Sequence, residues 1–391
     1  MSAVSPSASS PRAASTSAAR LSPFRVVRDP GLVRDVLHRP GDFSPANALV
    51  AVTPLTGSSL RVLQRARFAL PPILASNDTD SHAGVRKVVA GFFTPATVAA
   101  IEPRIRELAR ESARTAAARL SQPAGALEGR VDLVDTVAAL PPAVLMLELL
   151  GLDVPADELG ALKAWSRESL ELFWGWPDPE RQLELARSAA AFYDWLRDLV
   201  RRSVAARSRN LFAALDEHGL TTPEICSLGY FLLIAGQETT TQLISSVLFR
   251  ALEGSCPVTW AEACDPARAR EAVRHVLATE SSVPTWRRVT PRETTLGGET
   301  IPAGAEILLE LTGNHGVGGP GRPTDYGLAF GSGIHRCLGA KLAELEAAVV
   351  VQETAAALPR IRLADASPEW LRLLSFQAPR AVTVKGPTGD S

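Results

Sequence analysis

The chain has 391 residues, with 41 Lys and Arg against 42 Asp and Glu, and its formal net charge is -1. This balance excludes nucleic acid as a general partner, because nucleic acid selects strongly basic surfaces. Hydrophobic residues make up 46% of the chain, enough for a large buried core. The 4 cysteines show neither a paired framework nor zinc-ligand spacing, which fits a reducing cytosol.

Residues 1–20 are rich in Ser, Ala and Pro and contain no apolar stretch, so we expect a disordered leader and neither a signal peptide nor an anchor. No apolar run elsewhere approaches the roughly 20 residues that span a bilayer. We therefore predict a soluble cytoplasmic protein with no membrane partner, in which residues 21–391 form a single domain.

The first segment, Pro23 to Phe43, mixes short strand-like pieces with a helix that ends before Pro40. Helical patterns then dominate as far as Gly254. Thr94 and Pro95 are typical of an N-cap and a first helical residue, and a long helix rich in Ala, Arg and Glu follows them.

A second long helix is predicted from Thr221, where Thr-Thr-Pro-Glu224 is a capping box, to about Gly254. It is apolar on all sides, which places it at the centre of the fold. Strand-like segments follow at residues 294–301 (a hairpin), 306–311 and 381–384. The sequence therefore predicts a mainly α fold with small β-sheets.

The interior of this central helix contains Ala235-Gly236-Gln-Glu238-Thr239-Thr. Gly, Glu and Thr are poor residues for a buried helix. Gly236 removes a side chain where a ligand could approach, and Thr hydroxyls can bond to the carbonyl four residues back and bend the helix. A kink solvated by buried water would explain the segment equally well.

A glycine-rich loop near the end of the chain reads Phe330-Gly-Ser-Gly-Ile-His335-Arg-Cys337-Leu-Gly339 and precedes a helical pattern. Cys337 would meet free N–H groups at the start of that helix, which favour a thiolate. The loop glycines let the backbone approach a flat, bulky ligand. A buried thiolate against such a ligand is what haem iron needs for O–O cleavage, whereas the simpler alternative is an ordinary buried cysteine beside a turn.

These segments resemble the cytochrome P450 family, whose haem-binding signature the loop matches at every fixed position. The resemblance runs from about Pro23 to Val384. It implies the P450 fold, with haem b (iron protoporphyrin IX) between the central helix and the loop, and Cys337 as the axial ligand of the iron. It also places these residues against the haem: Ala235, Gly236, Phe330, Gly331 and Gly339.

The central-helix segment is similar to the family's Ala-Gly-x-Glu-Thr motif. By that resemblance Thr239 hydrogen-bonds dioxygen and Glu238 helps to relay protons to it. The resemblance implies that a set of hydrogen-bond donors binds the carboxylates of the haem. Two of these donors, His82 and Arg86, lie four residues apart on one face of a helix. The implied set is His82, Arg86, Arg288 and His335; for the first pair alone, a solvated helix face is the simpler explanation.

One family motif departs from its pattern. The family carries Glu-x-x-Arg on the helix before the first large sheet, and Glu271-Ala-Val-Arg274 matches it by letters. Counting forward from Asp265 and back from Arg288, the family's usual spacing instead places His275-Val-Leu-Ala278 at the position of the motif. An insertion of one helical turn after Arg274 is the alternative. The loop over residues 314–326 is also shorter than usual, which puts ordinary haem retention in doubt.

The implied substrate-binding segments contain an aromatic cluster and several apolar residues: Phe173, Trp174, Ile234, Val283 and Phe376. The aromatic rings could equally pack a loop between helices. Electrons are implied to come from a ferredoxin and its ferredoxin reductase. Arg336 and Lys341 flank Cys337 and offer a basic contact, although two charges also fit a solvated surface.

The leading interpretation is a haem-thiolate monooxygenase, an iron-containing oxidoreductase that oxidises a small, largely apolar or aromatic molecule in secondary metabolism. One alternative is a non-oxidative haem-thiolate isomerase, dehydratase or cyclase. The other is a non-catalytic haem-binding relative. The Glu238-Thr239 pair argues against the first alternative. The loss of the Glu-x-x-Arg pair and of the usual loop supports the second, whereas the intact cysteine motif argues against it.

Overall fold

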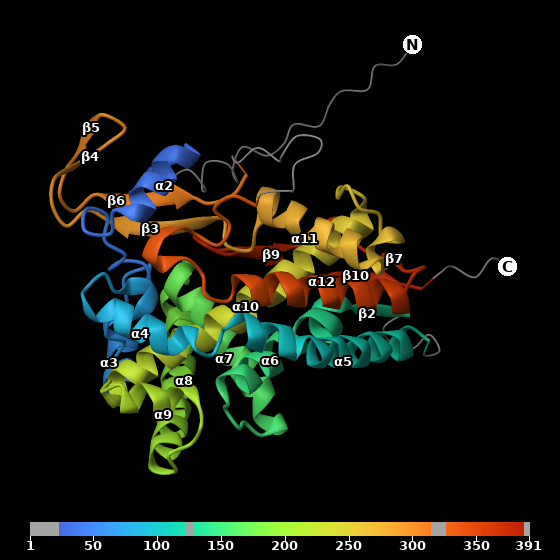
Figure 1. Cartoon of the computed structure of the whole chain (residues 1–391), viewed down its shortest axis with the longest axis horizontal. Coiled ribbons are helices and arrows are strands. Elements are labelled where there is room, and N and C mark those ends of the chain that lie inside the picture. The colour runs from blue at the N-terminus through green and yellow to red at the C-terminus, as the bar shows by residue number, and fades with distance from the viewer. Residues whose placement is uncertain (1–22, 122–128, 314–325, 387–391) are drawn as a thin grey trace.

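The computed structural model describes residues 23–121, 129–313 and 326–386. The predicted leader and nearly all of the short loop over residues 314–326 lie outside these ranges. The predicted single domain over residues 21–391 therefore stays a prediction. Within the described ranges the molecule is mainly helical with small sheets, as predicted (Figure 1).

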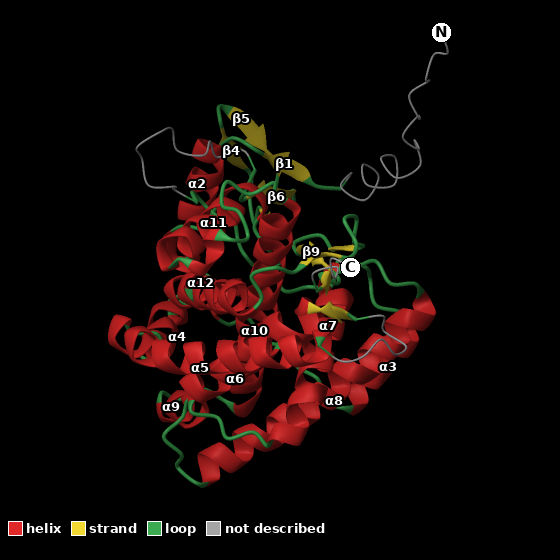
Figure 2. Ribbon diagram, turned by 90° about the vertical axis from the view of Figure 1, so that its right-hand side faces the viewer, coloured by secondary structure: helices red, strands yellow, loops and turns green. Residues whose placement is uncertain are grey.

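Helices form most of the molecule (Figure 2). The α-helices of the described residues are α2 (Pro30–His38), α3 (Gly57–Arg65), α4 (Ser81–Ala90), α5 (Pro95–Leu120), α6 (Leu140–Leu150), α7 (Leu159–Trp174), α8 (Pro179–Ala205), α9 (Leu211–Glu217), α10 (Thr222–Glu253), α11 (Pro266–Glu280) and α12 (Ala340–Ala357). The strands are β1 (Arg25–Val27), β2 (Arg130–Asp132), β3 (Thr285–Val289), β4 (Thr294–Leu296), β5 (Glu299–Ile301), β6 (Glu306–Glu310), β7 (Arg362–Leu363), β8 (Trp370–Arg372), β9 (Gln377–Pro379) and β10 (Thr383–Lys385).

The two long helices begin where their capping residues predict. The Thr94 side chain accepts the backbone N–H of Thr97 at the start of α5. At α10 the Thr221 and Glu224 side chains form the capping box, and Gly254 ends the helix in a left-handed conformation. Both predictions are confirmed, since the local hydrogen bonds that cap these helices depend on neighbouring residues alone.

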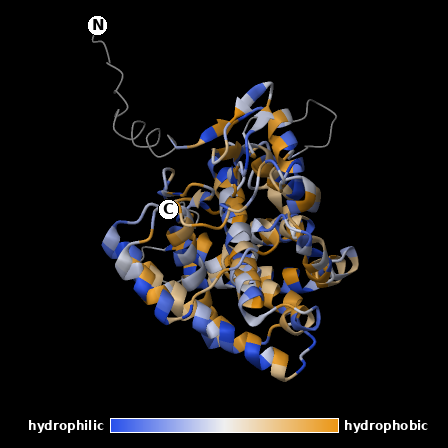
Figure 3. Ribbon diagram, turned by 90° about the vertical axis from the view of Figure 1, so that its left-hand side faces the viewer, coloured by the Kyte–Doolittle hydropathy of each residue, from blue (hydrophilic) through white to orange (hydrophobic). Residues whose placement is uncertain are grey.

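Helix α10 lies between two hydrophobic clusters and is buried along most of its length. Its first half, including Ile225 and Ile234, packs with α7 and α8, whereas residues such as Leu243 and Val247 pack with α5, α11 and α12. Figure 1 shows α10 passing through the middle of the molecule. The outer helices mix hydrophilic and hydrophobic residues, as expected for helices with one face on a core (Figure 3).

The small sheets position two parts of the site. One sheet has the order β1-β6-β3, with β1 parallel and β3 antiparallel to the central β6. A second has the order β2-β10-β7, and β4–β5 and β8–β9 are hairpins. Strand β3 carries Arg288, and Phe376 lies just before β9.

No single helix of the described part of the chain is both long and apolar enough to cross a membrane. Helices α4 and α5 pass that test by length and composition only when taken together, and they are bent by 44°.

Candidate active site

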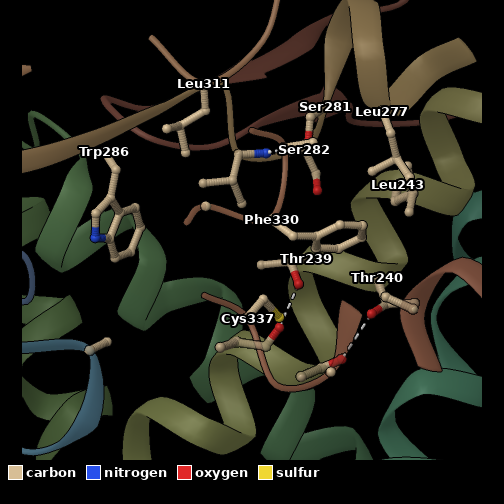
Figure 4. Close-up of a pocket in the computed structure, with 18 of the residues that line it drawn as sticks. Thr239, Thr240, Leu243, Leu277, Ser281, Ser282, Trp286, Leu311, Phe330 and Cys337 are labelled. Atoms are coloured by element: carbon tan, nitrogen blue, oxygen red, sulfur yellow. Dashed lines mark hydrogen bonds between the residues drawn. The ribbon is translucent and has the colours of Figure 1, made fainter. Parts of the chain in front are cut away.

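A cavity of about 270 Å³ separates α10 from the cysteine-bearing loop. Thr239 and Leu243 line it from α10, whereas Phe330 and Cys337 line it from the loop. Figure 4 shows these side chains around the cavity, with Leu277 and Leu311 among its other walls. Its lining is mostly apolar, so a bound group would be shielded from water and held largely by apolar contact.

The loop before α12 is held in a conformation that its glycines require. Gly331 and Gly333 both have a φ of 69°, in the left-handed region. A Cβ at Gly333 would lie 2.6 Å from the carbonyl oxygen of Leu37, so this glycine also allows close packing against α2. No atom lies within 4 Å of the Cβ position of Gly331, which lines the cavity. Only Gly331 therefore has the ligand-facing role predicted for both glycines.

The accessible surface of the Cys337 side chain faces the cavity, and protein surrounds the cavity. Burial raises the pKa of the Cys337 thiol, while the N–H of Gly339 and the charges of Arg86 and Arg336 lower it by smaller amounts. The sequence predicted that the helix start would favour a thiolate. That effect is present, but burial exceeds it, so the pKa of the thiol lies above its ordinary value. A metal cation bound to the sulfur would favour the thiolate.

The polar segment of α10 behaves largely as its residues predict. Thr239 donates its hydroxyl to the Ala235 carbonyl oxygen at 2.6 Å, and Thr240 donates to that of Gly236 at 3.1 Å. Gly236 lines the cavity, where it adds no side chain. A Cβ there would also lie 1.7 Å from Cε of Met146 on α6, so the same glycine allows close packing against that helix.

Glu238 does not line the cavity of Cys337. Its carboxyl group is 3% exposed and lies 3.6 Å from Lys163 Nζ and 3.9 Å from Arg167 Nε, both on α7. Burial raises the pKa of Glu238, and the two cations only partly offset this shift. Glu238 is thus a buried acid adjacent in sequence to Thr239, held on the α7 side of the helix.

The predicted carboxylate-binding donors lie together. The rings of His82 and His335 are 4.9 Å apart, and the nearby charges of Arg288, His82 and Arg86 add to burial in lowering the pKa of His335 to about 4. Arg288 is 1% exposed, and burial lowers its pKa to about 10. Within the described ranges none of these four residues forms an ion pair with a carboxylate.

These donors are incompletely satisfied by protein. Arg288 Nη1 donates to the carbonyl oxygen of Arg287 and Arg86 Nη2 to that of Arg336, while His335 Nε2–H donates to Asn77. Arg288 Nε and His82 Nε2 have no hydrogen-bond partner among the described residues. A buried arginine without an anion and buried N–H donors without an acceptor are both costly, so the cluster fits the carboxylates of a bound haem.

Four of the five predicted substrate residues line cavities. Val283 and Phe376 line the cavity of Cys337, and Trp174, Ile234 and Phe376 line an adjoining chamber of about 130 Å³. Phe173 lines neither. Its ring packs against Trp174, Tyr230 and Phe231 in the core, so the helix-packing alternative holds for this ring.

Trp286 lines both cavities and ends the segment over residues 283–286 that the family resemblance implies for substrate binding. Phe231 also lines the chamber and was missed. Phe231 lies three residues before Ile234 on α10, a helical spacing that could have predicted it. Lys163 and Arg167 were also missed, because their contact with Glu238 joins helices far apart in the sequence.

The Glu271-x-x-Arg274 segment lies on α11, but these two residues do not pair with each other. Glu271 forms an ion pair with Arg268 on its own helix. Arg274 Nε lies 2.6 Å from Glu344 Oε1 on α12. Ala278, at the position where spacing places the motif arginine, is 1% exposed and has no side chain to form an ion pair.

No protein-family model matches the chain. It is 31% identical over 329 residues to the cytochrome P450 monooxygenase PikC of Streptomyces venezuelae, covering 80% of this chain and 74% of PikC. It is also 31% identical over 324 residues to the erythromycin C-12 hydroxylase of Saccharopolyspora erythraea, covering 77% of each chain. A solved structure of cytochrome P450 CREJ, in complex with (4-ethylphenyl) dihydrogen phosphate, superposes with a TM-score of 0.83. It has 28% sequence identity and covers 93% of this chain and 92% of that chain.

Fold and site together define a haem-thiolate protein. The chain belongs to the cytochrome P450 family, and it is a haem-containing monooxygenase of the bacterial type. The predicted family, fold and cofactor are confirmed.

Proposed function

We propose that this enzyme oxidises a small, largely apolar or aromatic molecule in specialised metabolism. Dioxygen is the oxidant, and electrons come from a separate ferredoxin and its ferredoxin reductase in the cytoplasm. The observation that carries the proposal is the placement of the Thr239 hydroxyl and the Cys337 thiol on opposite walls of one apolar cavity. The erythromycin C-12 hydroxylase, whose name gives a hydroxylation, supports oxidation as the reaction.

When bound, thiolate-ligated haem supplies oxygen activation. Cys337 is the residue that would hold the iron. The cluster of His82, Arg86, Arg288 and His335 would hold the carboxylates. Leu243, on the α10 wall, would help to exclude water.

Thr239 is the proposed proton donor within the cavity. Its hydroxyl now donates to the Ala235 carbonyl, and turning about χ1 would aim the same proton at the cavity. Glu238 resupplies that proton, because its raised pKa favours the protonated acid. Lys163 and Arg167 hold its carboxyl group away from the cavity, so transfer requires a change of rotamer or a bridging water.

The chamber beside the haem site favours a flat substrate. Trp174, Trp286 and Phe376 form part of its wall, and the centroids of the Trp174 and Phe376 rings are 4.9 Å apart. Aromatic walls favour rigid, flat apolar ligands over flexible chains, which lose more conformational entropy on binding. Spectral titration should therefore give tighter binding for bicyclic aromatic compounds than for fatty acids of equal carbon number. The reverse order would refute this substrate class.

A ferredoxin would dock on the side of the loop that carries Arg336. Arg336 is exposed and directly precedes Cys337, and the Lys341 side chain is 75% exposed. Changing Arg336 to Glu should slow reduction by ferredoxin and leave reduction by dithionite unchanged, because only the protein donor depends on surface charge. An equal effect on both donors would contradict the docking site.

The central test is Thr239→Ala, with Ser245→Ala as the matched control on the same helix. With the best ligand from the titration, Thr239→Ala should lower product formed per electron pair and release peroxide. Ser245→Ala should couple normally, because Ser245 does not line the cavity and its hydroxyl donates to the Thr241 carbonyl within the helix. Unchanged product formation by Thr239→Ala would refute the relay and favour the non-oxidative alternative.

A further inference from the structure

The loop that carries Cys337 makes side-chain contacts with the rest of the protein near its beginning as well as at its end, where α12 starts. The Tyr326 ring packs edge-on against Phe330, with centroids 5.3 Å apart and planes at 84°. The carbonyl oxygen of Phe330 accepts the backbone N–H of Cys337 at 2.9 Å. Phe330 and Cys337 both line the haem cavity. A shift of Tyr326 would therefore pass through Phe330 to the sulfur atom.

Glu344 joins this loop to two helices. It lies seven residues after Cys337 on α12 and is 6% exposed. Its Oε1 accepts from Arg274 Nε on α11 at 2.6 Å, and its Oε2 accepts the Tyr326 hydroxyl at 3.3 Å. Lys341 Nζ lies 3.7 Å from Oε2. One buried carboxylate thus contacts α11, the start of the loop and its own helix.

These contacts restrain the loop because the carboxylate is fixed. A buried charge is tolerated only where donors satisfy it, so Glu344 cannot move without losing Arg274 or Tyr326. Helices α11 and α12 lie side by side (Figure 1), and Val273 and Val350 belong to the same buried hydrophobic cluster. The anchor on α11 is therefore rigid, and the restraint acts on Tyr326.

We propose that Glu344 is a positioning residue for the haem-ligating cysteine. With Arg274 and Tyr326 it forms a clasp that fixes the loop at the register in which Cys337 faces the cavity. The clasp gives Arg274 a role other than pairing with Glu271. This proposal concerns ligation of the haem and does not depend on the proposed substrate or on the proton relay.

A simpler explanation is that Glu344 forms an ordinary stabilising ion pair, and α12 contains a matched control for it. Glu353 is 8% exposed on the same helix and accepts from Arg106 and from Arg110, the latter at 2.9 Å. Both arginines belong to α5, and Glu353 lines no part of the haem cavity. Glu344→Gln and Glu353→Gln therefore remove comparable carboxylates, only one of which touches the cysteine loop.

The experiment compares holoenzymes of the wild type, Glu344→Gln, Glu353→Gln and Tyr326→Phe. Two quantities are measured: the share of carbon-monoxide-bound ferrous haem with the red-shifted Soret band of thiolate ligation, and the rate of haem transfer to apomyoglobin. Glu344→Gln should convert part of that band to the neutral-ligand form and speed haem loss about tenfold, the factor for one hydrogen bond to a charged group. Glu353→Gln should lower the thermal midpoint and leave the band unchanged.

Tyr326→Phe keeps the ring and removes only the hydroxyl, so it tests the clasp if Glu344→Gln fails to fold. It should shift the band in the same direction, by less, and add less in the Glu344→Gln background than in the wild type, because the Tyr326 hydroxyl acts on the loop through Glu344. If neither change alters the band, or if Glu353→Gln alters it as much as Glu344→Gln, the proposal is wrong and Glu344 is an ordinary ion pair.

Discussion

Glu346 should make the stability of this protein fall as pH rises. It lies on α12, is 2% exposed, and its Oε1 has no hydrogen-bond partner among the described residues. Burial raises the pKa of Glu346 to about 8 from the ordinary value of 4.5, and the charge of Lys163 only partly offsets this shift. The perturbation that tests this is Glu346→Gln, which keeps the shape and cannot ionise.

The sign follows from where the proton is bound. Between the two pKa values the unfolded chain has lost the Glu346 proton while the folded protein keeps it, so rising pH favours unfolding. Each unit changes the free energy of unfolding by about 1.4 kcal/mol. With folded and unfolded values of about 8 and 4.5, the wild type loses about 3.5 kcal/mol between pH 5 and pH 8 through this group alone. The glutamine variant does not have this loss.

The assay is urea unfolding of the two holoenzymes between pH 5 and pH 8. The free energy of unfolding of Glu346→Gln, relative to the wild type, should rise by about 3.5 kcal/mol across this range. Glu353→Gln, from the same helix, shows what loss of any α12 carboxylate does. A difference between Glu346→Gln and the wild type that stays constant with pH would show that burial does not raise the pKa of Glu346, since a normally titrating Glu346 is already ionised throughout most of the range.

Two further predictions concern the walls of the site. Gly236→Ala should lower the free energy of unfolding by about 1–3 kcal/mol, because its Cβ would overlap Met146. Met146→Ala in that background should recover part of the loss. Thermal unfolding measures both effects, and an unchanged stability of Gly236→Ala would show that Met146 moves freely. Arg288→Leu should speed haem transfer to apomyoglobin at least about tenfold, with Arg288→Lys intermediate, because a buried carboxylate would lose its charged donor. Equal transfer rates in all three proteins would remove Arg288 from the haem site.

Features set by neighbouring residues were predictable from the sequence. The N-cap of α5, the capping box of α10 and the glycines of the β4–β5 hairpin defined these elements, since each depends on bonds within a few residues. The cysteine loop was predictable for the same reason, because its glycines need left-handed backbone angles. The family signature then assigned the haem ligand.

Contacts between distant segments were not predictable. The sequence does not show that Gly236 faces Met146, or that Phe173 turns into the core while its neighbour Trp174 lines the chamber. The contact of Glu344 with Arg274 likewise depends on how α11 and α12 pack. Such contacts join residues that no sequence motif marks as partners, and only the packed structure brings them together.

The central claim, that Cys337 holds haem iron as a thiolate, is tested most directly by the absorption spectrum of the purified protein, reduced with dithionite under carbon monoxide. We expect a strongly red-shifted Soret band in the wild type and its absence in Cys337→Ala. A band typical of a neutral axial ligand in the wild type, or no haem at all, would contradict ligation by the Cys337 thiolate.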